Sequence, residues 1–374
     1  MNPVLVVLAT PLFFLAMLLD WVCCQRAGIR AYRLMATLSD LASGCGQQVL
    51  SLFFMGIAMA TYDAIASHAA LHIQPSLLSW VGLFLLDDLL FYLFHRASHR
   101  VGLLWASHAV HHQSEDYNLA VALRQAWFAP LFGLPFFLPL SLLGFPTAMV
   151  VTVRTLNTLY QFWIHTRAVK SLGSLEGILN TPAHHRVHHG RNPEYLDSNY
   201  GGILILWDRL FSTFVREQHE PHYGTVTPLR SWNAAWANLN EWLQLWRKLT
   251  QAQRIRDKLW SVVAPPEWKP GQSTRRAPAV TDPALCSPQP ALRYDHRPAP
   301  LVRAYSVIHL LVAIAMTDSL LIYRSQLDAG LVLCGAAFVL ATVATLGAWC
   351  DGRRWAPWGE ALRLLVLLLA LQQL

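Results

Sequence analysis

Long apolar runs constrain the fold of this chain more than any other feature of its sequence. They cover residues 3–22, 41–62, 76–94, 126–152, 303–322, 329–349 and 358–373. A helix needs about 20 apolar residues to cross the hydrocarbon core of a bilayer, where every backbone hydrogen bond must be made internally. Charged residues make up 14% of the chain, whereas about a quarter is usual in soluble domains. The sequence therefore predicts an all-α, multi-span integral membrane protein.

The distribution of basic residues predicts how these spans are oriented. Arg26, Arg30 and Arg33 follow the first apolar run, whereas the loop at residues 63–75 contains no Lys or Arg. Because cytoplasmic loops carry the excess of basic residues, the first loop is predicted to be cytoplasmic, and the third run returns His95 to that side. Such loops also explain the net charge of +7. Since no basic helix or RNA-binding signature accompanies this charge, we expect no nucleic-acid partner.

The run at residues 126–152 is interrupted by four prolines and is too short for two comfortable crossings. Histidine clusters lie on both sides of it in the sequence and are expected to meet on one face of the membrane. We therefore expect a short hairpin that enters and leaves from the cytoplasmic side.

Two histidine clusters follow the third apolar run. The first, H-R-A-S-H-R-V-G-L-L-W-A-S-H-A-V-H-H, spans residues 95–112, and the second, H-H-R-V-H-H, spans residues 184–189. A buried imidazole needs a partner for each ring nitrogen, so core packing does not favour such clusters. An H-x-x-x-H pair and two H-x-x-H-H triplets have helical spacings that bring their members to one helix face. The sequence predicts a metal centre with the ligands His95, His99, His108, His111, His112, His185, His188 and His189.

Eight histidines exceed the four ligands of one tetrahedral site, so we expect either two metal ions or several rings that support the ligands. His165, in Q-F-W-I-H-T, is a ninth candidate, and a hydrogen-bonded interfacial histidine is the alternative. Asp88 shares a predicted helix stripe with His95 near the end of a span, where a bare carboxylate is costly. We expect Asp88 to accept a ring N–H from a ligand histidine. The alternative for Asp88 is an ordinary interfacial carboxylate.

Ligation by nitrogen alone suits zinc, iron, copper or nickel. Two metals with open positions beside a bilayer favour oxygen activation by iron, because a hydrocarbon C–H bond offers no handle for acid–base chemistry. Zinc-dependent hydrolysis is the rival. The sequence contains no H-E-x-x-H motif and no glutamate within the clusters that would serve as its base.

The order of the three histidine motifs on a multi-span chain resembles the fatty acid hydroxylase and sterol desaturase superfamily of membrane di-iron oxygenases. Flanking runs narrow the resemblance to members that cleave ether lipids. These runs are S-E-D-Y-N-L-A-V-A-L-R-Q (114–125), Y-Q-F-W-I-H-T (160–166), L-N-T-P-A-H-H-R-V-H-H-G-R-N (179–192) and L-D-S-N-Y-G-G-I-L-I-L-W-D-R-L-F (196–211). Together with residues 88–112 they cover most of residues 80–215. Arg100 departs from the pattern of these relatives, which have an acidic residue there.

The resemblance implies an oxygen-dependent monooxygenase with two iron ions per chain and tetrahydrobiopterin as a cofactor. Such an enzyme would hydroxylate the alkyl carbon beside the ether oxygen of a membrane lipid, giving a hemiacetal that falls apart to a fatty aldehyde and a glycerol lipid. The iron ligands would be the eight histidines of the motifs together with His165. Asn199 and Asp197 would support the site, and a capped turn before Gly201 and Gly202 is the alternative. The sequence by itself indicates neither a pterin site nor another electron donor.

On this basis the chain divides into four parts. N-terminal transmembrane helices are predicted for residues 1–75, a fatty acid hydroxylase-like catalytic domain for 76–262, a proline-rich linker for 263–300 and C-terminal transmembrane helices for 301–374. The linker composition predicts poor order. The last part shows no group of ionisable residues on a common stripe, so we expect its helices to be structural.

Other functions remain open at this stage. Within the superfamily, the alternative is a sterol, fatty-acyl or carotenoid hydroxylase or desaturase. From another class, the alternative is a non-catalytic membrane metal-binding protein or a transporter. A transporter would be expected to hold its metal-site residues inside the spans, whereas here most of the histidines follow them.

Overall fold

The computed structural model describes residues 3–272 and 293–371. In these ranges the chain forms helices and two isolated β-bridges, and no strand. The elements up to the second histidine cluster are α1 (Pro3–Arg26), α2 (Leu34–Ala66), α3 (Leu77–Arg100), α4 (Gly102–Ala106), α5 (Ala109–His112), α6 (Leu119–Ala122), α7 (Ala129–Leu142), α8 (Thr147–Trp163), the 3-10 helix η1 (Gly173–Gly177) and α9 (Pro182–His188). The later elements are α10 (Leu206–Leu210), α11 (Ala234–Gln251), α12 (Ile255–Val263), α14 (Pro300–Tyr323), α15 (Ala329–Cys350) and α16 (Ala356–Leu371).

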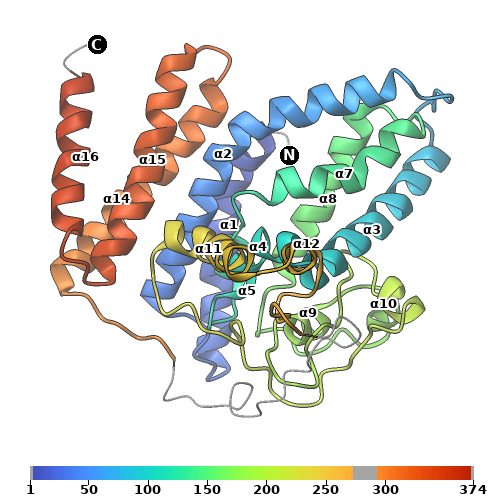
Figure 1. Cartoon of the computed structure of the whole chain (residues 1–374), viewed down its shortest axis with the longest axis horizontal. Helices are drawn as coiled ribbons and strands as arrows, with labels where there is room; N and C mark the ends of the chain where they lie inside the picture. Colours follow the sequence, from blue (N-terminus) through green and yellow to red (C-terminus); the bar gives the residue numbers. More distant parts are fainter. Residues whose placement is uncertain (1–2, 273–292, 372–374) are drawn as a thin grey trace.

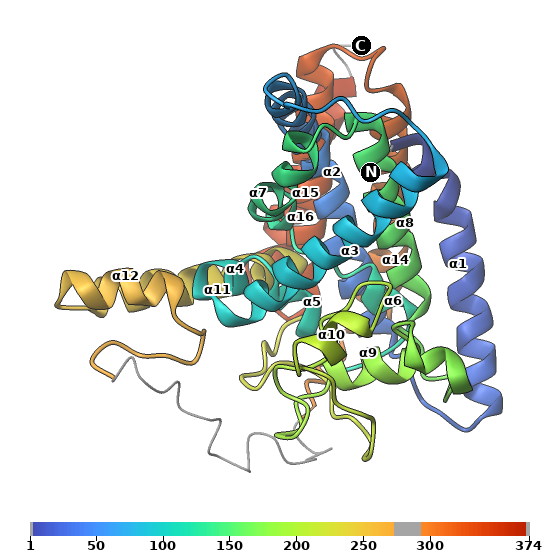
Figure 2. The same ribbon diagram turned by 90° about the vertical axis from the view of Figure 1, so that its right-hand side faces the viewer.

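The long helices and the short ones occupy different regions of the molecule. Figure 1 shows α2, α3, α7, α8 and α14 to α16 mainly in the upper part, with α9, α10 and their loops below, and α1 extends alongside both regions. In Figure 2, α11 and α12 run across the boundary between these two regions.

Five helices are long and apolar enough to cross a bilayer: α1 from Val7, then α2, α3, α14 and α15. The prediction of an all-α integral membrane protein is therefore confirmed. The helices α7 and α16, with 14 and 16 residues, are short for a full crossing.

The proline-interrupted run forms α7 and the start of α8, and these two helices make a hairpin. The turn at Gly144 lies against the α2–α3 connection, where the Ile73 N–H donates to the Gly144 carbonyl at 3.0 Å. The second arm extends beyond the end of the apolar run, because α8 continues to Trp163. Arg154 lies within this arm, and its guanidinium is 3.4 Å from the Asp87 carboxylate of α3. Arg154 is the charged residue that ends the apolar run in the sequence, and the ion pair with Asp87 compensates its charge.

The C-terminal helices pack onto the N-terminal ones in one apolar core. Val49 of α2, Leu310 of α14 and Val339 of α15 belong to the same buried cluster, which also contains Trp127 and Ala234. Most of the predicted proline-rich linker, residues 273–292, lies outside the described residues.

A buried ionisable group joins the C-terminal helices, which their separate apolar runs did not indicate. Glu360 and Arg363 of α16 form an ion pair and are 3% and 5% exposed. The Glu360 carboxylate accepts from the hydroxyls of Tyr305 in α14 and Thr345 in α15, both at 2.6 Å. Arg363 also lies 3.0 Å from the His309 ring. Since its members come from three separate apolar runs, the group does not appear as a stripe on any one of them.

Candidate metal centre

The structure brings the nine candidate histidines together in two adjacent clusters at the end of α3. The first cluster contains His95, His99, His108, His112 and His188, and the second contains His111, His165, His185 and His189. Within each cluster, one ring nitrogen from every member lies within 4.8 Å of the others. The two clusters touch, because the rings of His112 and His189 stack with centroids 4.3 Å apart.

Each H-x-x-H-H triplet is divided between the clusters, which the prediction of three rings on one helix face missed. In the first triplet, His108 and His112 face the first cluster and His111 faces the second. In the second triplet, the i and i+4 residues His185 and His189 share the second cluster, and His188 turns to the first. Neighbouring helix positions diverge by about 100°, so adjacent histidines face different clusters. Each triplet thus contributes rings to both clusters instead of crowding one.

The spacing of the ring nitrogens fits ligands of a common ion. His108 Nε2 and His112 Nε2 are 3.1 Å apart, as are the Nε2 atoms of His185 and His165, and His165 Nε2 lies 3.2 Å from His111 Nε2. Nitrogens bound to one ion at about 2.1 Å lie roughly 3.0–3.4 Å apart in octahedral or tetrahedral geometry. The described nitrogens are therefore already at ligand spacing.

Backbone carbonyls orient four of the rings. His95 Nδ1 lies 2.9 Å from the Tyr200 carbonyl and His188 Nδ1 lies 2.9 Å from the Ser198 carbonyl. In the second cluster, the Nδ1 atoms of His111 and His165 lie 3.1 Å and 2.7 Å from the carbonyls of Arg124 and Gln161. A ring that donates Nδ1–H to a carbonyl presents the Nε2 lone pair on its other side, which is the arrangement found in metal sites.

Several buried ring nitrogens have no hydrogen-bond partner among the described residues: His99 Nε2, His185 Nδ1, His188 Nε2 and His189 Nε2. Such orphaned groups are costly unless an ion or a water satisfies them. Burial lowers the pKa of His111 to about 4, and burial together with the nearby rings lowers the pKa of His189 well below its usual value. The rings are neutral at physiological pH, as ligation requires. The residues present thus fit metal ions in both clusters.

His184 stays outside both clusters. Its Nδ1 lies 3.4 Å from the backbone N–H of Thr181, at the start of α9, and its ring packs against Phe214.

Asp88 is close to the clusters but has a different role from the one expected. Its carboxylate, fully buried, accepts the backbone N–H groups of Ile203 and Leu204 at 2.8 and 3.0 Å and the indole N–H of Trp207 at 2.9 Å. His95, the ligand candidate on the same helix stripe, turns its ring instead to the Tyr200 carbonyl. Asp88 therefore fixes the loop that supplies this carbonyl and does not orient the ring directly.

The loop after the second triplet is held by a second carboxylate. Asp208 accepts the backbone N–H groups of Tyr200 and Gly201 at 2.8 and 2.7 Å. Glycine is needed at position 202, because a Cβ atom there would lie 2.8 Å from an Asp88 carboxylate oxygen. These contacts bring the carbonyls of residues 198 and 200 against the histidine rings.

Asn199 belongs to the same loop and ties it to a third segment. Its amide donates to the His184 carbonyl at 3.1 Å and to the Val215 carbonyl at 2.8 Å, and its side-chain oxygen accepts the Val215 N–H. Its φ of 55° is left-handed, a conformation that asparagine tolerates better than most residues. Asp197 forms an ion pair with Arg100. Neither side chain contacts a histidine ring of the clusters, and both stabilise the surrounding loop.

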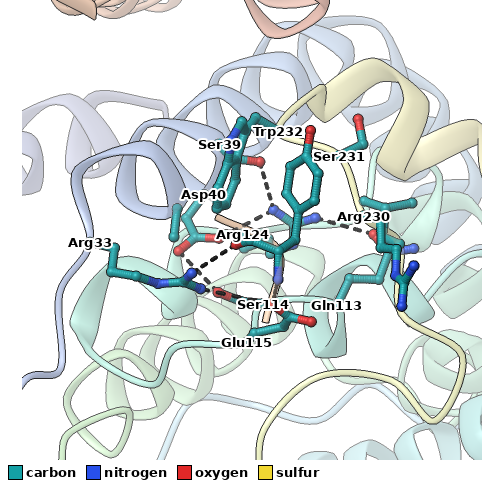
Figure 3. A pocket seen from close by; sticks show the side chains of 13 residues that line it. Arg33, Ser39, Asp40, Gln113, Ser114, Glu115, Arg124, Arg230, Ser231 and Trp232 are labelled. Carbon is teal, nitrogen blue, oxygen red and sulfur yellow. Dashed lines mark hydrogen bonds and ion pairs between the residues drawn. The ribbon is translucent and has the colours of Figure 1, made fainter. Parts of the chain in front are cut away.

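Sequence reasoning missed a buried polar group beneath α5, which Figure 3 shows around Arg124. The Arg124 guanidinium lies 3.2 Å from the Asp40 carboxylate of α2 and donates to the Val110 carbonyl at 2.6 Å and to Gln113 at 3.1 Å. Because the Arg124 carbonyl also contacts His111, this group positions the first triplet. The only signal in the sequence is that Asp40 and Arg124 are charges beside apolar runs.

A second missed residue is Arg186, between the histidines of α9. It is buried, donates to Glu217 at 2.8 and 2.6 Å, and donates to the carbonyls of Thr166 and Val169 at 3.1 and 2.7 Å. It therefore joins α9 to the segment that follows His165.

A cavity of about 610 Å³ opens beside the clusters. His99, His112, His188 and His189 form its inner wall, and Trp105 packs against the rings of His99 and His112. Its remaining walls come from the end of α3, from α4 and α11, from the loops after α9 and from the segment after α12. They carry the polar side chains Arg100, Arg191, Asp197, Glu241, Gln244, Lys248 and Glu267. The volume is that of an ordinary small-molecule site. A bound molecule can therefore reach the exposed edge of the candidate metal centre.

Comparison with known proteins identifies the family. The sequence model of the fatty acid hydroxylase family matches residues 80–213. Alkylglycerol monooxygenase of Xenopus tropicalis is 34% identical over 96% of this chain and 80% of its own length, and that of Homo sapiens is 33% identical over 96% and 81%. Alkylglycerol monooxygenase of Danio rerio is 36% identical over 89% of this chain and 74% of its own length. No solved structure matches the chain.

The matches cover both the histidine clusters and most of the spanning helices, which agrees with the superfamily resemblance of the motifs. The chain belongs to the alkylglycerol monooxygenase family within the fatty acid hydroxylases, and it is an oxygen-dependent monooxygenase of lipids that is integral to the membrane.

Proposed function

We propose that the protein binds two iron ions, one in each histidine cluster, and cleaves the ether bond of alkylglycerol lipids. The observation that carries the proposal is the division of nine histidines into clusters of five and four with nitrogens at ligand spacing. Iron is proposed because proteins named as monooxygenases are similar in sequence to this chain over most of its length. Residues 76–262 would carry out the chemistry, and the flanking helices would anchor it.

In the proposed reaction, one atom of O2 is inserted into the C–H bond of the alkyl carbon beside the ether oxygen, and the other leaves as water. The donor supplies two electrons and two protons. The product is a hemiacetal, which collapses to a fatty aldehyde and a free glycerol hydroxyl. Bound iron would supply the oxidising chemistry that such a C–H bond requires.

The chain's own residues would prepare the centre for this reaction. The carbonyls of Ser198 and Tyr200 hold the rings of His188 and His95 in the orientation that exposes Nε2. Trp105 covers one side of the first cluster and limits the access of water. The substrate would approach through the cavity beside His99 and His112.

We propose tetrahydrobiopterin as the electron donor. The polar wall of the cavity offers carboxyl groups for a ring that is rich in N–H donors, among them Glu241 of α11. Arg100, which replaces the acidic residue of the family pattern, is paired with Asp197 on the same wall, so a carboxylate is still available there.

We further propose that the clusters face the cytoplasm. The basic residues Arg26, Arg30 and Arg33 support this orientation, because they follow α1 on the side to which α3 delivers His95 and His99.

The test is incubation of detergent-purified protein with an alkylglycerol, O2 and tetrahydrobiopterin, followed by detection of the fatty aldehyde. The proposal predicts aldehyde that depends on both O2 and the pterin. A matched diacylglycerol, which has no ether carbon, controls for hydrolysis of other bonds. Iron-containing protein that hydroxylates a sterol or a fatty acyl chain without aldehyde release would overturn the ether-lipid assignment. Aldehyde formation with a different reductant alone would overturn the choice of pterin.

A further inference from the structure

The helices α11 and α12 have an unusual distribution of apolar side chains. Along α11, Trp236, Leu239, Leu243 and Trp246 recur at helical spacing and are all exposed, Trp246 by 63%. In α12 the exposed side chains are Ile255, Leu259 and Val263, with Ile255 exposed by 73%. We call these seven residues the apolar stripe. Contiguous exposed apolar surface of this kind marks contact with a protein or a membrane.

The opposite face of α11 is directed inward and is the more polar one. Glu241, Gln244, Leu245 and Lys248 line the cavity beside the histidine clusters. These positions lie about 170° around the helix from the centre of the stripe on α11. The helix is thus a wall with the cavity on one side and an apolar surface on the other, the reverse of a surface helix in water.

Basic residues flank the stripe on α12. Arg256 and Lys258 lie on either side of the line formed by Ile255 and Leu259, and Arg254 precedes it. Long basic side chains beside a buried apolar face are typical of helices that lie in the headgroup layer, where the charged ends reach the phosphates.

The stripe also continues the membrane-facing part of the molecule. Trp242, one residue from Leu243, packs its ring against Phe128 and Phe132 at the start of α7, with centroids 5.7 and 5.2 Å apart. Figure 2 shows α11 and α12 running across the ends of the long helices, with α7 and α15 on one side of them and α9 and α10 on the other. An apolar face on the side of the long helices is in position to meet lipid.

We infer that α11 and α12 form an interfacial platform that lies in the headgroup layer of the bilayer and admits the lipid substrate to the cavity from that leaflet. The occupant of the stripe is the bilayer itself, at the boundary between headgroups and acyl chains. The statement about substrate entry rests on the proposed lipid monooxygenase function, whereas the statement about the bilayer does not.

The platform is joined rigidly to the candidate metal centre. The Gly102 N–H, two residues after Arg100 at the end of α3, donates to the Ala264 carbonyl at 2.8 Å. A Cβ atom on Gly102 would lie 2.8 Å from the Ser261 carbonyl oxygen, so the two backbones are in contact. The depth of the platform therefore sets the depth of the cavity mouth relative to the leaflet.

Site-specific quenching tests the position of the platform without any assay of activity. Full-length protein lacking Cys23, Cys286 and Cys334 would carry a single bimane label at Leu243→Cys or Leu259→Cys, in bilayers containing doxyl-labelled lipids. The matched control is Gln218→Cys, which is exposed in the segment between α10 and α11. We expect shallow 5-doxyl lipid to quench the platform labels at least about threefold more than the control label, and more than deep 12-doxyl lipid does.

Equal quenching of platform and control labels would overturn the inference. So would disulfide crosslinking of Leu243→Cys between two chains at the expense of lipid quenching, because the stripe would then be covered by a second copy.

Kinetics test the admission of substrate. In Leu243→Glu, a charge in the stripe should raise the KM for alkylglycerol, expressed as its mole fraction in the bilayer, by roughly tenfold, with kcat within about twofold. Activity toward a short, water-soluble alkylglycerol and the metal content should be unchanged. Gln251→Glu places the same charge on α11 beside the stripe and should behave as wild type, and Leu243→Ala should give a smaller increase in KM.

An unchanged KM in Leu243→Glu, with quenching as expected, would overturn the role in substrate entry and leave the bilayer contact standing. A wild-type protein that is inactive on all alkylglycerols but shows the quenching pattern would refute the proposed function and not the platform.

Discussion

Removing the Asp88 carboxylate is predicted to weaken one metal site and spare the other. In Asp88→Ala, the N–H groups of Ile203, Leu204 and Trp207 lose a buried acceptor. Each unsatisfied buried donor costs about 1–3 kcal/mol, so the local loss is roughly 3–6 kcal/mol after partial relaxation. This is a large fraction of a typical domain stability of about 5–15 kcal/mol, so the loop should detach while the helices remain folded.

The detached loop carries the carbonyls that orient two rings of the first cluster, those of His95 and His188. Loss of such supporting contacts typically weakens metal binding by about 10–100-fold. The rings of His111 and His165 depend on other carbonyls and should keep their metal. Titration of the iron-loaded protein with a chelator, followed by elemental analysis, should show one ion released at much lower chelator concentration than in the wild type.

Asp87→Asn is the control for this experiment. Asp87 is also buried in α3, but it pairs with Arg154 and does not contact the loop. The Asp87→Asn substitution should lower the stability of the protein without changing the release of either ion. If Asp88→Ala retains both ions as firmly as the wild type, or if both substitutions release metal alike, the reasoning about the loop is refuted.

Three further predictions address the centre. His108→Ala and His185→Ala should each leave one iron per chain, retained in the other cluster, as measured by elemental analysis; loss of both ions in each variant would mean that the clusters act as one site. Arg124→Met leaves Asp40 buried and unpaired, so it should cost about 3–5 kcal/mol, whereas the double variant with Asp40→Leu should recover much of it in thermal unfolding. Metal-stripped protein should lose stability as the pH falls from about 6.5 towards 4, because burial lowers the pKa of His111 to about 4 and the unfolded chain takes up protons first. Tryptophan-monitored melting in detergent checks this slope, and a flat profile would contradict it.

Sequence patterns indicated the spanning helices and the histidines that gather at the end of α3, and the reason is physical. Apolar length limits a segment to a spanning helix, and imidazoles at helical spacing have few other uses. Their partition between two clusters was not accessible, because it depends on where α3, α5 and α9 meet and not on the spacing within any one of them. For this reason His111 and His188 each lie in a different cluster from the other two histidines of their triplet.

Long-range polar contacts account for most of what the sequence did not indicate. Asp88 was expected to accept from a histidine, but three of its donors lie more than a hundred residues away, in the loop around Leu204, and a fourth is Asn157 of α8. Arg124 and Asp40 are separated by 84 residues and look like unrelated charges. Similarly, Glu360 and Arg363 form a buried group only when α14, α15 and α16 are packed together. No local pattern contains such pairings.

Metal analysis of the wild-type protein, purified in detergent from iron-replete cells, tests the central claim most directly. Two clusters that each hold one ion predict two irons per chain and little zinc. Zinc alone in such a preparation, or a single iron that survives replacement of His185, would contradict the assignment of a two-iron oxygenase centre.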